Sequence, residues 1–209
     1  MADAVAHYVR IPTECRVSKA ENTSLLAPIT EDDILVAVRG LSRRKAGGED
    51  GLNNDFYADY ADVIAPKLAQ TCNSLLQGAP PPASFLKAVV GPLRKKGDSS
   101  NALDYRPILL LQSSYKIFAK ILATRLQSFL GKLIGDTQQG FVHGRQMDRS
   151  VAMMLAVLET VYRDQQGLPG DTPGILLLDF AKEYDTVDRV YQFEVLRHFG
   201  FDLRFVDLM

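Results

Sequence analysis

Hydrophobic residues recur at helical spacing over most of the chain and predict five amphipathic helices. These helices are expected over residues 28–46, 54–78, 113–134, 148–166 and 189–201. Thr30 can cap the first helix and the Ser113–Ser114 pair the third, because hydroxyl side chains accept hydrogen bonds from free helix amides. Pro66 predicts a bend or a restart within the second helix. The Met153–Met154 pair and the leucines around it are expected in a core.

Three shorter stretches have the apolar character of β-strands. The stretch "LKAVVGPLRKKGD" (residues 86–98) predicts a strand that runs into a basic turn, and "YRPILLL" (105–111) predicts a second strand. The stretch "ILLLDF" (175–180) predicts a third strand, buried on both faces because its apolar run is continuous. Residues 1–28 show no clear period and predict a tail or linker. This order of elements predicts an α+β fold, with helices packed on a small mixed sheet.

The composition indicates a globular domain with a local basic stretch. The chain has 209 residues, of which 46% are hydrophobic and 23% charged, as in ordinary soluble proteins. Its formal net charge of -1 gives no global signature of nucleic-acid binding. Residues 86–145, however, hold ten Lys or Arg against three acidic residues, a local net charge of +7. This stretch predicts a positively charged surface.

The sequence also predicts where the protein resides. The N-terminus has no apolar segment of signal-peptide length, and no apolar run approaches the length of a membrane-spanning helix. Cys15 and Cys72 lack metal-binding spacing and predict free thiols in a reducing compartment. We therefore expect an intracellular protein, nuclear or cytoplasmic, with no membrane partner.

The apolar run of residues 175–178 ends at Asp179, and two interpretations of this acid compete. Its carboxylate can cap the following turn or pair with Lys182, which would be a structural role. Alternatively, it can hold a hard divalent cation such as Mg²⁺, which takes oxygen ligands. The sequence contains no "GxxxxGK[ST]" loop, which excludes a P-loop phosphate site, and its three histidines lack the spacing of a transition-metal site.

A series of motifs, taken in order, resembles the reverse transcriptase domain of non-LTR (LINE-type) retrotransposons. The series consists of "GEDGLNNDFY", "KKGD", "YRPI", "YKIFAKILATRL", "DTQQGFVHGR" and "LLLDFAKEYDTVD". The resemblance covers roughly residues 30–209 and implies a partial right-hand polymerase fold. The fingers would span about residues 29–170 and the start of the palm about residues 171–209. It also implies DNA synthesis on an RNA template.

The resemblance implies roles for the residues that match. Asp179 matches the first catalytic aspartate, which binds both Mg²⁺ ions of a two-metal nucleotidyl transfer, with the Phe180 carbonyl as a further metal ligand. Tyr184 matches the aromatic residue that excludes the 2′-hydroxyl of a ribonucleotide. Arg106 matches a basic residue near the incoming triphosphate.

The resemblance also implies nucleic-acid contacts for a set of polar residues: Lys95, Lys96, Gln138 and Arg145. Each contact has a structural alternative. The two lysines can simply form a solvated basic turn. The motif that contains Gln138 can instead be a loop fixed by Gly140, with Phe141 buried.

Two departures from the family pattern affect the expected activity. The "-ADD-" hairpin that supplies further catalytic carboxylates does not occur before Met209, and Glu183 stands where the family usually has alanine. Asp185 and Asp188 are expected at a turn and a helix start. The complete enzyme would use an RNA template, a DNA primer, dNTPs and two Mg²⁺ ions. We expect the 209 residues alone to hold Mg²⁺ poorly, with the remainder of the polymerase as their partner.

Two other hypotheses stay open. The chain can be a non-catalytic nucleic-acid-binding module, or a relic, that uses the basic surface of residues 86–145. It can also be an incomplete domain with an exposed half-core.

We expect no primer extension from the purified 209-residue chain supplied with Mg²⁺, template, primer and dNTPs. The reason is that one carboxylate and one carbonyl leave two Mg²⁺ ions short of ligands. A labelled primer resolved on a denaturing gel measures this, with a complete polymerase as the positive control. Robust extension would contradict the expectation.

Overall fold

The computed structural model describes residues 9–95, 100–101, 104–164, 176–180 and 186–209. The elements run in the order η1 (Thr13–Cys15), α2 (Lys19–Leu25), α3 (Glu31–Arg39), α4 (Asn54–Asp59), α5 (Ala61–Leu76), β1 (Ala88–Arg94), β2 (Tyr105–Leu111), α6 (Ser113–Leu133), α7 (Met147–Asp164), α9 (Arg189–His198) and α10 (Leu203–Asp207). They form two compact units, each described by itself. Residues 20–126 and 202–209 make the hairpin unit, and residues up to 19 together with 127–201 make the α7 unit. Helices and strands together confirm the α+β class.

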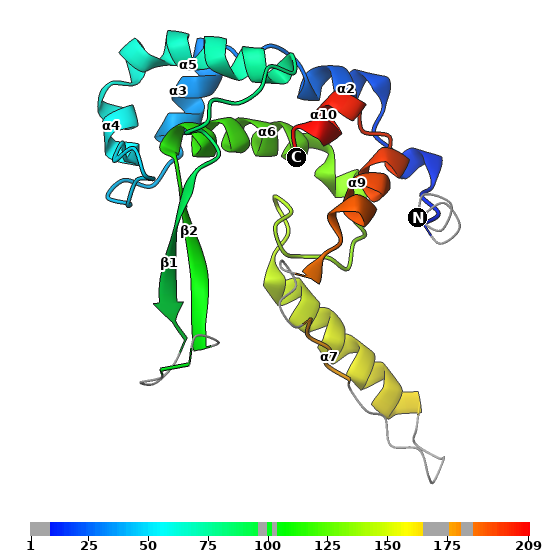
Figure 1. Cartoon of the computed structure of the whole chain (residues 1–209). Helices are drawn as coiled ribbons and strands as arrows, with labels where there is room; N and C mark the ends of the chain where they lie inside the picture. The colour runs from blue at the N-terminus through cyan, green and yellow to red at the C-terminus, as the bar shows by residue number, and fades with distance from the viewer. Residues whose placement is uncertain (1–8, 96–99, 102–103, 165–175, 181–185) are drawn as a thin grey trace. The chain divides into compact units, whose positions relative to one another are not determined.

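The core of the hairpin unit lies between α3, α5 and the first part of α6 (Figure 1). Ile34, Cys72 and Ile117, one from each helix, are at most 1% exposed. Burial raises the pKa of the Cys72 thiol to about 12, so this sulfur is a protonated, inert core group. The helical spacing of the apolar residues therefore predicted the faces that pack here.

Helix α3 begins where the sequence predicted. The Thr30 hydroxyl accepts a hydrogen bond from the Asp33 amide at 3.1 Å, and the Asp33 carboxylate accepts one from the Thr30 amide at 3.0 Å. This reciprocal capping box satisfies two amides at the start of the helix and fixes its first turn. The helix ends at Arg39 instead of continuing to residue 46, and Gly40 follows as its C-cap.

The helix does not restart at Pro66, which was one of the two predicted outcomes, because the break lies earlier, at Tyr60. Tyr60 ends α4 and precedes α5, with φ -113° and ψ 23°. Pro66 lies inside α5. Proline lacks the N–H that would otherwise bond to the carbonyl of Asp62, and the helix continues through this position.

The segment between α2 and α3 is held by polar side chains from two other helices. Arg125 of α6 donates to the carbonyls of Leu25, Ala27 and Pro28 at 3.1, 2.5 and 3.1 Å, and pairs with Asp33 at 3.1 Å. From α5, the Asn73 side chain accepts a hydrogen bond from the Ile29 amide at 2.7 Å and donates to the Ile29 carbonyl at 2.8 Å. Buried carbonyls and amides of this irregular segment are thereby satisfied.

The prediction of a tail or linker over residues 1–28 is wrong for its last part. Residues 19–25 form α2, and Leu25 is 0% exposed. In the α7 unit, the Val17 amide donates to the Phe199 carbonyl at 2.7 Å, and Val17 is 7% exposed. The sequence did not predict these contacts, because each involves a single apolar residue and a single residue gives no hydrophobic period.

Strands β1 and β2 lie where the sequence predicted two strands, and they pair as an antiparallel hairpin. Ala88 lies opposite Leu111 and Arg94 opposite Tyr105. Within the described residues the sheet is purely antiparallel and no helix covers it, which corrects the expected packing. Both strands are exposed on both faces, including Val90 at 60% and Leu109 at 58%. A two-stranded ribbon has no third strand or helix to bury either face.

A proline lies opposite a proline in the middle of this hairpin. Pro92 pairs with Pro107, and the Lys95 amide donates to the Asp104 carbonyl at 2.8 Å three positions further along. Hydrogen-bonded and non-hydrogen-bonded pairs alternate in an antiparallel ladder. Pro92 and Pro107 are therefore a non-hydrogen-bonded pair, and the hairpin loses no ladder hydrogen bond to them.

A buried polar network anchors the junction between β2 and α6. The Ser113 hydroxyl donates to Asn54 Oδ1 at 2.8 Å, and Asn54 Nδ2 donates to the Ser42 carbonyl at 2.8 Å. The Gln112 amide nitrogen lies 2.6 and 2.9 Å from the two carboxylate oxygens of Asp50. The Ser113 hydroxyl thus binds α4, whereas the sequence predicted that it caps α6.

Close backbone approach explains the glycine at position 48. A Cβ there would lie 2.8 Å from the backbone nitrogen of Gln112, so only glycine lets the 47–51 turn reach this network.

The α7 unit leaves its long helix largely uncovered. Met153 and Met154 are 42% and 39% exposed, and Leu155 is 57% exposed. The prediction that this stripe lies in a core is therefore wrong. Helix α9 begins at the predicted Asp188, whose side chain accepts from the Tyr191 amide at 3.0 Å. Across the described ranges, none of the helices combines the length and apolar character needed to cross a bilayer.

Replacing Arg125 by Lys is expected to lower the free energy of unfolding by about 1–3 kcal/mol, because the single nitrogen of an ammonium group cannot span the acceptors that the two guanidinium nitrogens reach. Chemical denaturation followed by circular dichroism measures the change. Arg204→Lys is the control, since Arg204 pairs only locally with Asp202 and is 68% exposed in its side chain. The control should change stability by less than about 0.5 kcal/mol. Equal effects of the two substitutions would contradict the role of Arg125.

Candidate functional site

Residues 176–180 contain the predicted catalytic Asp179 and lie in no helix or strand. Their apolar side chains are about four-fifths exposed: Leu176 80%, Leu177 83%, Leu178 81% and Phe180 79%. The predicted buried strand is therefore wrong for these residues. A strand persists only when its N–H and C=O groups pair with a neighbour, and the described part of the chain offers this segment no such pairing. Tyr184, Glu183 and Asp185 lie outside the described residues.

The described residues do not assemble a magnesium site. Asp179 is exposed, and no group of three or more His, Cys, Asp or Glu side chains within the described ranges could hold a metal ion. Mg²⁺ needs a near-octahedral set of oxygen ligands, which the Asp179 carboxylate and the Phe180 carbonyl do not complete. No catalytic step through the metal follows from these residues.

The hairpin brings Arg106, the predicted triphosphate contact, close to Lys95, a predicted nucleic-acid contact. Arg106 lies opposite Leu93 in the ladder, and Lys95 follows two positions after Leu93. Because side chains alternate between the faces of a strand, Lys95 and Arg106 lie on the same face as diagonal neighbours, roughly 7–8 Å apart. Both residues are exposed. Lys96 lies outside the described residues.

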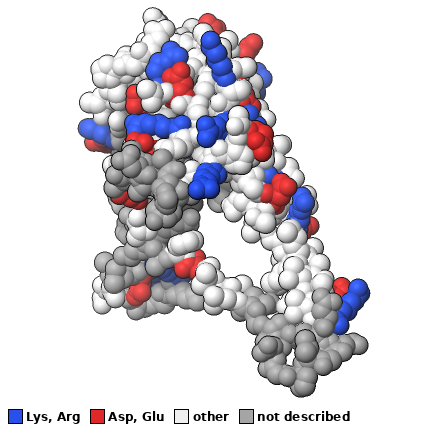
Figure 2. Space-filling view, turned by 90° about the vertical axis from the view of Figure 1, so that its right-hand side faces the viewer, with Lys and Arg blue, Asp and Glu red and all other residues white. Residues whose placement is uncertain are grey.

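Most other cations of the 86–145 stretch are engaged in the fold. Lys87 pairs with Glu49 at 3.3 Å, Lys120 donates to the Gly40 carbonyl at 2.5 Å, and Arg125 clasps the α2–α3 connection. On the face shown in Figure 2, Lys and Arg side chains are interspersed with Asp and Glu. The net charge of +7 therefore overstates the basic surface, and Lys95 and Arg106 remain its clearest described part.

Arg145 is a structural residue in the α7 unit, which corrects its predicted contact with nucleic acid. Its guanidinium donates to four carbonyls at 2.6–3.1 Å and its side chain is 12% exposed: the acceptors are Gly131, Ile134, Gly135 and Gln138. Gly131 lies in the last turn of α6 and Ile134 directly follows that helix, where free carbonyls attract a cation. Arg145 therefore ties the following loop to that helix end. Gln138 itself is exposed, as a binding role requires.

Phe141 is exposed and strained, which contradicts the alternative in which it was buried. It is 88% exposed and has a φ of +63°, a region that residues other than glycine rarely adopt. The Gln127 side chain binds the backbone directly after the Phe141 Cα with both of its polar atoms. Its Nε2 donates to the Phe141 carbonyl at 2.7 Å, and its Oε1 accepts from the His143 amide at 2.9 Å. Sequence reasoning missed Gln127, because nothing local marks its two partners.

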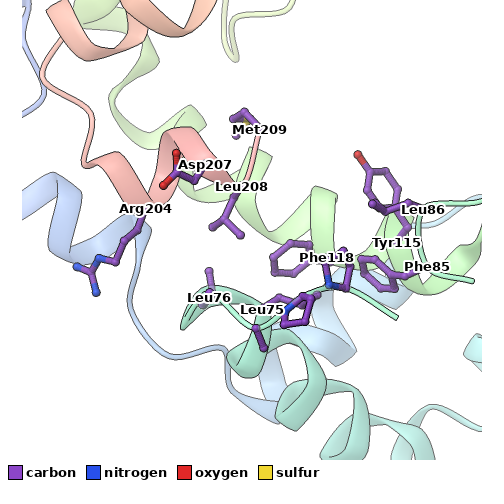
Figure 3. A pocket seen from close by; sticks show the side chains of 14 residues that line it. Leu75, Leu76, Phe85, Leu86, Tyr115, Phe118, Arg204, Asp207, Leu208 and Met209 are labelled. Atoms are coloured by element: carbon purple, nitrogen blue, oxygen red, sulfur yellow. The ribbon is translucent and has the colours of Figure 1, made fainter. Parts of the chain in front are cut away.

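The hairpin unit also contains an apolar pocket of about 510 Å³ (Figure 3). Phe85, Tyr115 and Phe118 form its aromatic side, with ring centroids 5.6 and 6.1 Å apart around Phe85. Leu208 lies across from them, and Arg204 and Asp207 are at one end. This lining suits apolar contact and holds none of the predicted site residues.

Comparisons with known proteins extend the resemblance seen in the motifs. Residues 93–208 match the model of the family described as "Reverse transcriptase (RNA-dependent DNA polymerase)". The chain is also 32% identical over 190 residues to a Xenopus laevis protein described as "Transposon TX1 uncharacterized 149 kDa protein". The alignment covers 91% of this chain and 14% of that protein. Both Arg106 and Asp179 lie in the range that the family model matches.

The positive φ of Phe141 predicts how two substitutions at this position will differ in stability. Phe141→Gly should be about 1 kcal/mol more stable than Phe141→Ala, because only glycine adopts a φ of +63° without a steric penalty. Both variants lose the same exposed ring, so Phe141→Ala is the matched control for the side chain. Denaturant titration of the two proteins measures the difference. An alanine variant as stable as the glycine variant would show that the loop does not hold this conformation.

Proposed function

The chain belongs to the reverse transcriptase (RNA-dependent DNA polymerase) family, of the non-LTR retrotransposon type, and we propose that it supplies the fingers and the start of the palm of an enzyme that copies RNA into DNA. The observation that carries this proposal is the order of the matched parts. The match to the family begins in β1, includes the basic hairpin end with Arg106, and continues past Asp179. The chain spans 14% of the curated relative that it matches, so the activity of the whole protein is part of the proposal.

We assign Asp179 as the first catalytic carboxylate, with the Phe180 carbonyl beside it. In the complete site, bound Mg²⁺ would neutralise the negative charge that develops during nucleotidyl transfer. The contribution of this chain is a carboxylate presented at the end of an apolar segment, where it is open to solvent and to further ligands. Tyr184 would exclude ribonucleotides, and Arg106 would contact the incoming triphosphate. The motif match supports these roles.

A nucleic-acid-binding module without catalysis is the second candidate function. It is favoured by the exposed, diagonal placement of Lys95 and Arg106 on one face of a free-standing hairpin. Two cations at this spacing can contact successive phosphates of a strand. Both candidates place nucleic acid at this end of the hairpin, through Lys95 in the polymerase and through Lys95 and Arg106 together in the binding module. They differ in whether Asp179 takes part in chemistry.

Replacing Lys95, Lys96 and Arg106 together by Gln is expected to weaken RNA binding and to reduce its salt dependence. Each lost phosphate contact lowers the slope of log affinity against log salt by about 0.7 for a single strand, so the triple variant should lose about 2. Fluorescence anisotropy of a labelled RNA oligonucleotide across a salt series measures both quantities.

The control carries the same change in net charge elsewhere in the hairpin unit. Arg39, Lys45 and Lys67 are exposed and lie outside the hairpin, and their replacement by Gln should leave the slope within about 0.5 of the original value. Binding that is unchanged in the hairpin variant, or equally weakened in the control, would count against both candidate functions.

A further inference from the structure

The 47–51 turn binds both strands of the hairpin at their base through two consecutive acidic residues. Glu49 pairs at 3.3 Å with Lys87, which directly precedes β1. The amide nitrogen of Gln112, which directly follows β2, lies 2.6 and 2.9 Å from the carboxylate oxygens of Asp50. The ladder register places Lys87 opposite Gln112, so both side chains point to the same face of the hairpin.

The contact of Asp50 with Gln112 is the stronger of the two. Both side chains of the Glu49–Lys87 pair are 56% exposed, and an ion pair so exposed contributes little to stability. Gln112 is 2% exposed, so its amide would lose the hydrogen bond to Asp50 without gaining one to water. A hydrogen bond to a charged acceptor is also stronger than one between neutral groups.

The turn presents the Asp50 carboxylate in a fixed position. The Gly51 amide donates to the Gly48 carbonyl at 3.1 Å, which closes the turn. The Leu52 amide donates to Asp50 Oδ1 at 3.0 Å, which orients the carboxylate. A side chain that is already oriented loses little rotamer entropy when it binds a second group.

The sheet itself does not set the direction of the hairpin. Its strands are exposed on both faces, and they extend away from the helices of the hairpin unit (Figure 1). Phe85, before the hairpin, packs on Tyr115 and Phe118, and Ser113, after it, binds Asn54. A ribbon anchored at these two points can still tilt about the line that joins them. The 47–51 turn adds a contact to each strand from a third segment.

The direction of the hairpin matters because of the cations near its far end. Arg106 lies five positions before Leu111, the last residue of β2, and a strand rises about 3.3 Å per residue. Arg106 is therefore about 17 Å from the base of the hairpin. A tilt of about 10° at the base would move it by about 3 Å, the length of a hydrogen bond.

We propose that the 47–51 turn is a clamp that sets the direction of the hairpin, and that Asp50 and Gln112 are positioning residues for Arg106. The clamp follows from contacts within the chain and requires no ligand. Its value in placing Arg106 beside a triphosphate rests on the proposed function.

The distance between two spin labels tests the clamp. One label is attached to Leu93→Cys, because Leu93 is 53% exposed and lies opposite Arg106. The other is attached to Gln70→Cys, at an exposed position of α5. Cys15→Ser removes the partly exposed native thiol, and Cys72 is 0% exposed. Pulsed electron paramagnetic resonance then gives the distribution of distances in the 209-residue chain without nucleic acid.

Three variants change the clamp. Gln112→Glu sets two carboxylates against each other, so the distribution should shift or widen by about 3 Å. Asp50→Ala should do the same, and it buries no new charge because Asp50 is an exposed residue. Asp50→Asn combined with Gln112→Glu restores an amide opposite a carboxylate with the roles exchanged, and should return the original distribution.

Asp59→Ala is the matched control. It also removes an exposed carboxylate, but one that pairs with Arg43 and not with the hairpin, so the distribution should stay unchanged. Circular dichroism verifies that each variant is folded. If Gln112→Glu does not fold, Asp50→Ala and its control decide the test.

The outcomes separate the clamp from a general loss of stability and from the proposed function. Recovery in the exchanged pair supports the clamp, because general destabilisation would not be reversed by a second substitution. The clamp is wrong if Asp50→Ala leaves the distribution unchanged, if Asp59→Ala alters it equally, or if the exchanged pair stays as altered as Gln112→Glu. These results leave the proposed function standing, and a chain that does not bind RNA would leave the clamp standing.

Discussion

The hairpin unit depends on how the irregular connection between α2 and α3 is held. Arg125 binds three of its carbonyls, and Asn73 binds the amide and carbonyl of Ile29. These two side chains come from α6 and α5, so the same contacts that satisfy the connection also set α3 against the helices that cover it. The polar network of Ser113 and Asn54 then fixes the start of α6, where the hairpin joins the core. The basic end of the hairpin is thus supported by buried polar contacts and not by sheet packing.

The sequence predicted those parts of the fold that local chemistry determines. The Thr30 cap, the hairpin strands, the helix start at Asp188 and the long helices follow from neighbouring residues and from periodicity. Arg125 was not predictable in its role, because its partners are 92–100 residues away. The prediction of a strand over residues 176–180 was wrong for a related reason. The apolar run shows that the segment is hydrophobic, but not whether a neighbouring strand is present to pair with it.

In the candidate site, too, the sequence predicted what local residues determine and missed what distant contacts determine. The motifs predicted a triphosphate contact for Arg106 and a nucleic-acid contact for Lys95, and the ladder register puts the two cations on one face. The same motifs could not separate Arg145, which clasps four carbonyls, from residues that face solvent. A cation that binds carbonyls within the fold and a cation that faces solvent look the same in the sequence, and only the tertiary contacts distinguish them. Phe141 is the reverse case. One interpretation of its motif had this ring buried, and the structure leaves it exposed.

The opposed prolines of the hairpin have a consequence for the behaviour of the protein at high concentration. In a non-hydrogen-bonded pair the backbone groups point away from the partner strand, so Pro92 and Pro107 remove an outward amide near the middle of each edge. Apolar strands with free edges are templates for the growth of intermolecular sheets. Here an incoming strand would meet an interrupted row of donors on either side. The hairpin can therefore keep its valines and leucines open to a ligand without recruiting further copies of itself into a fibril.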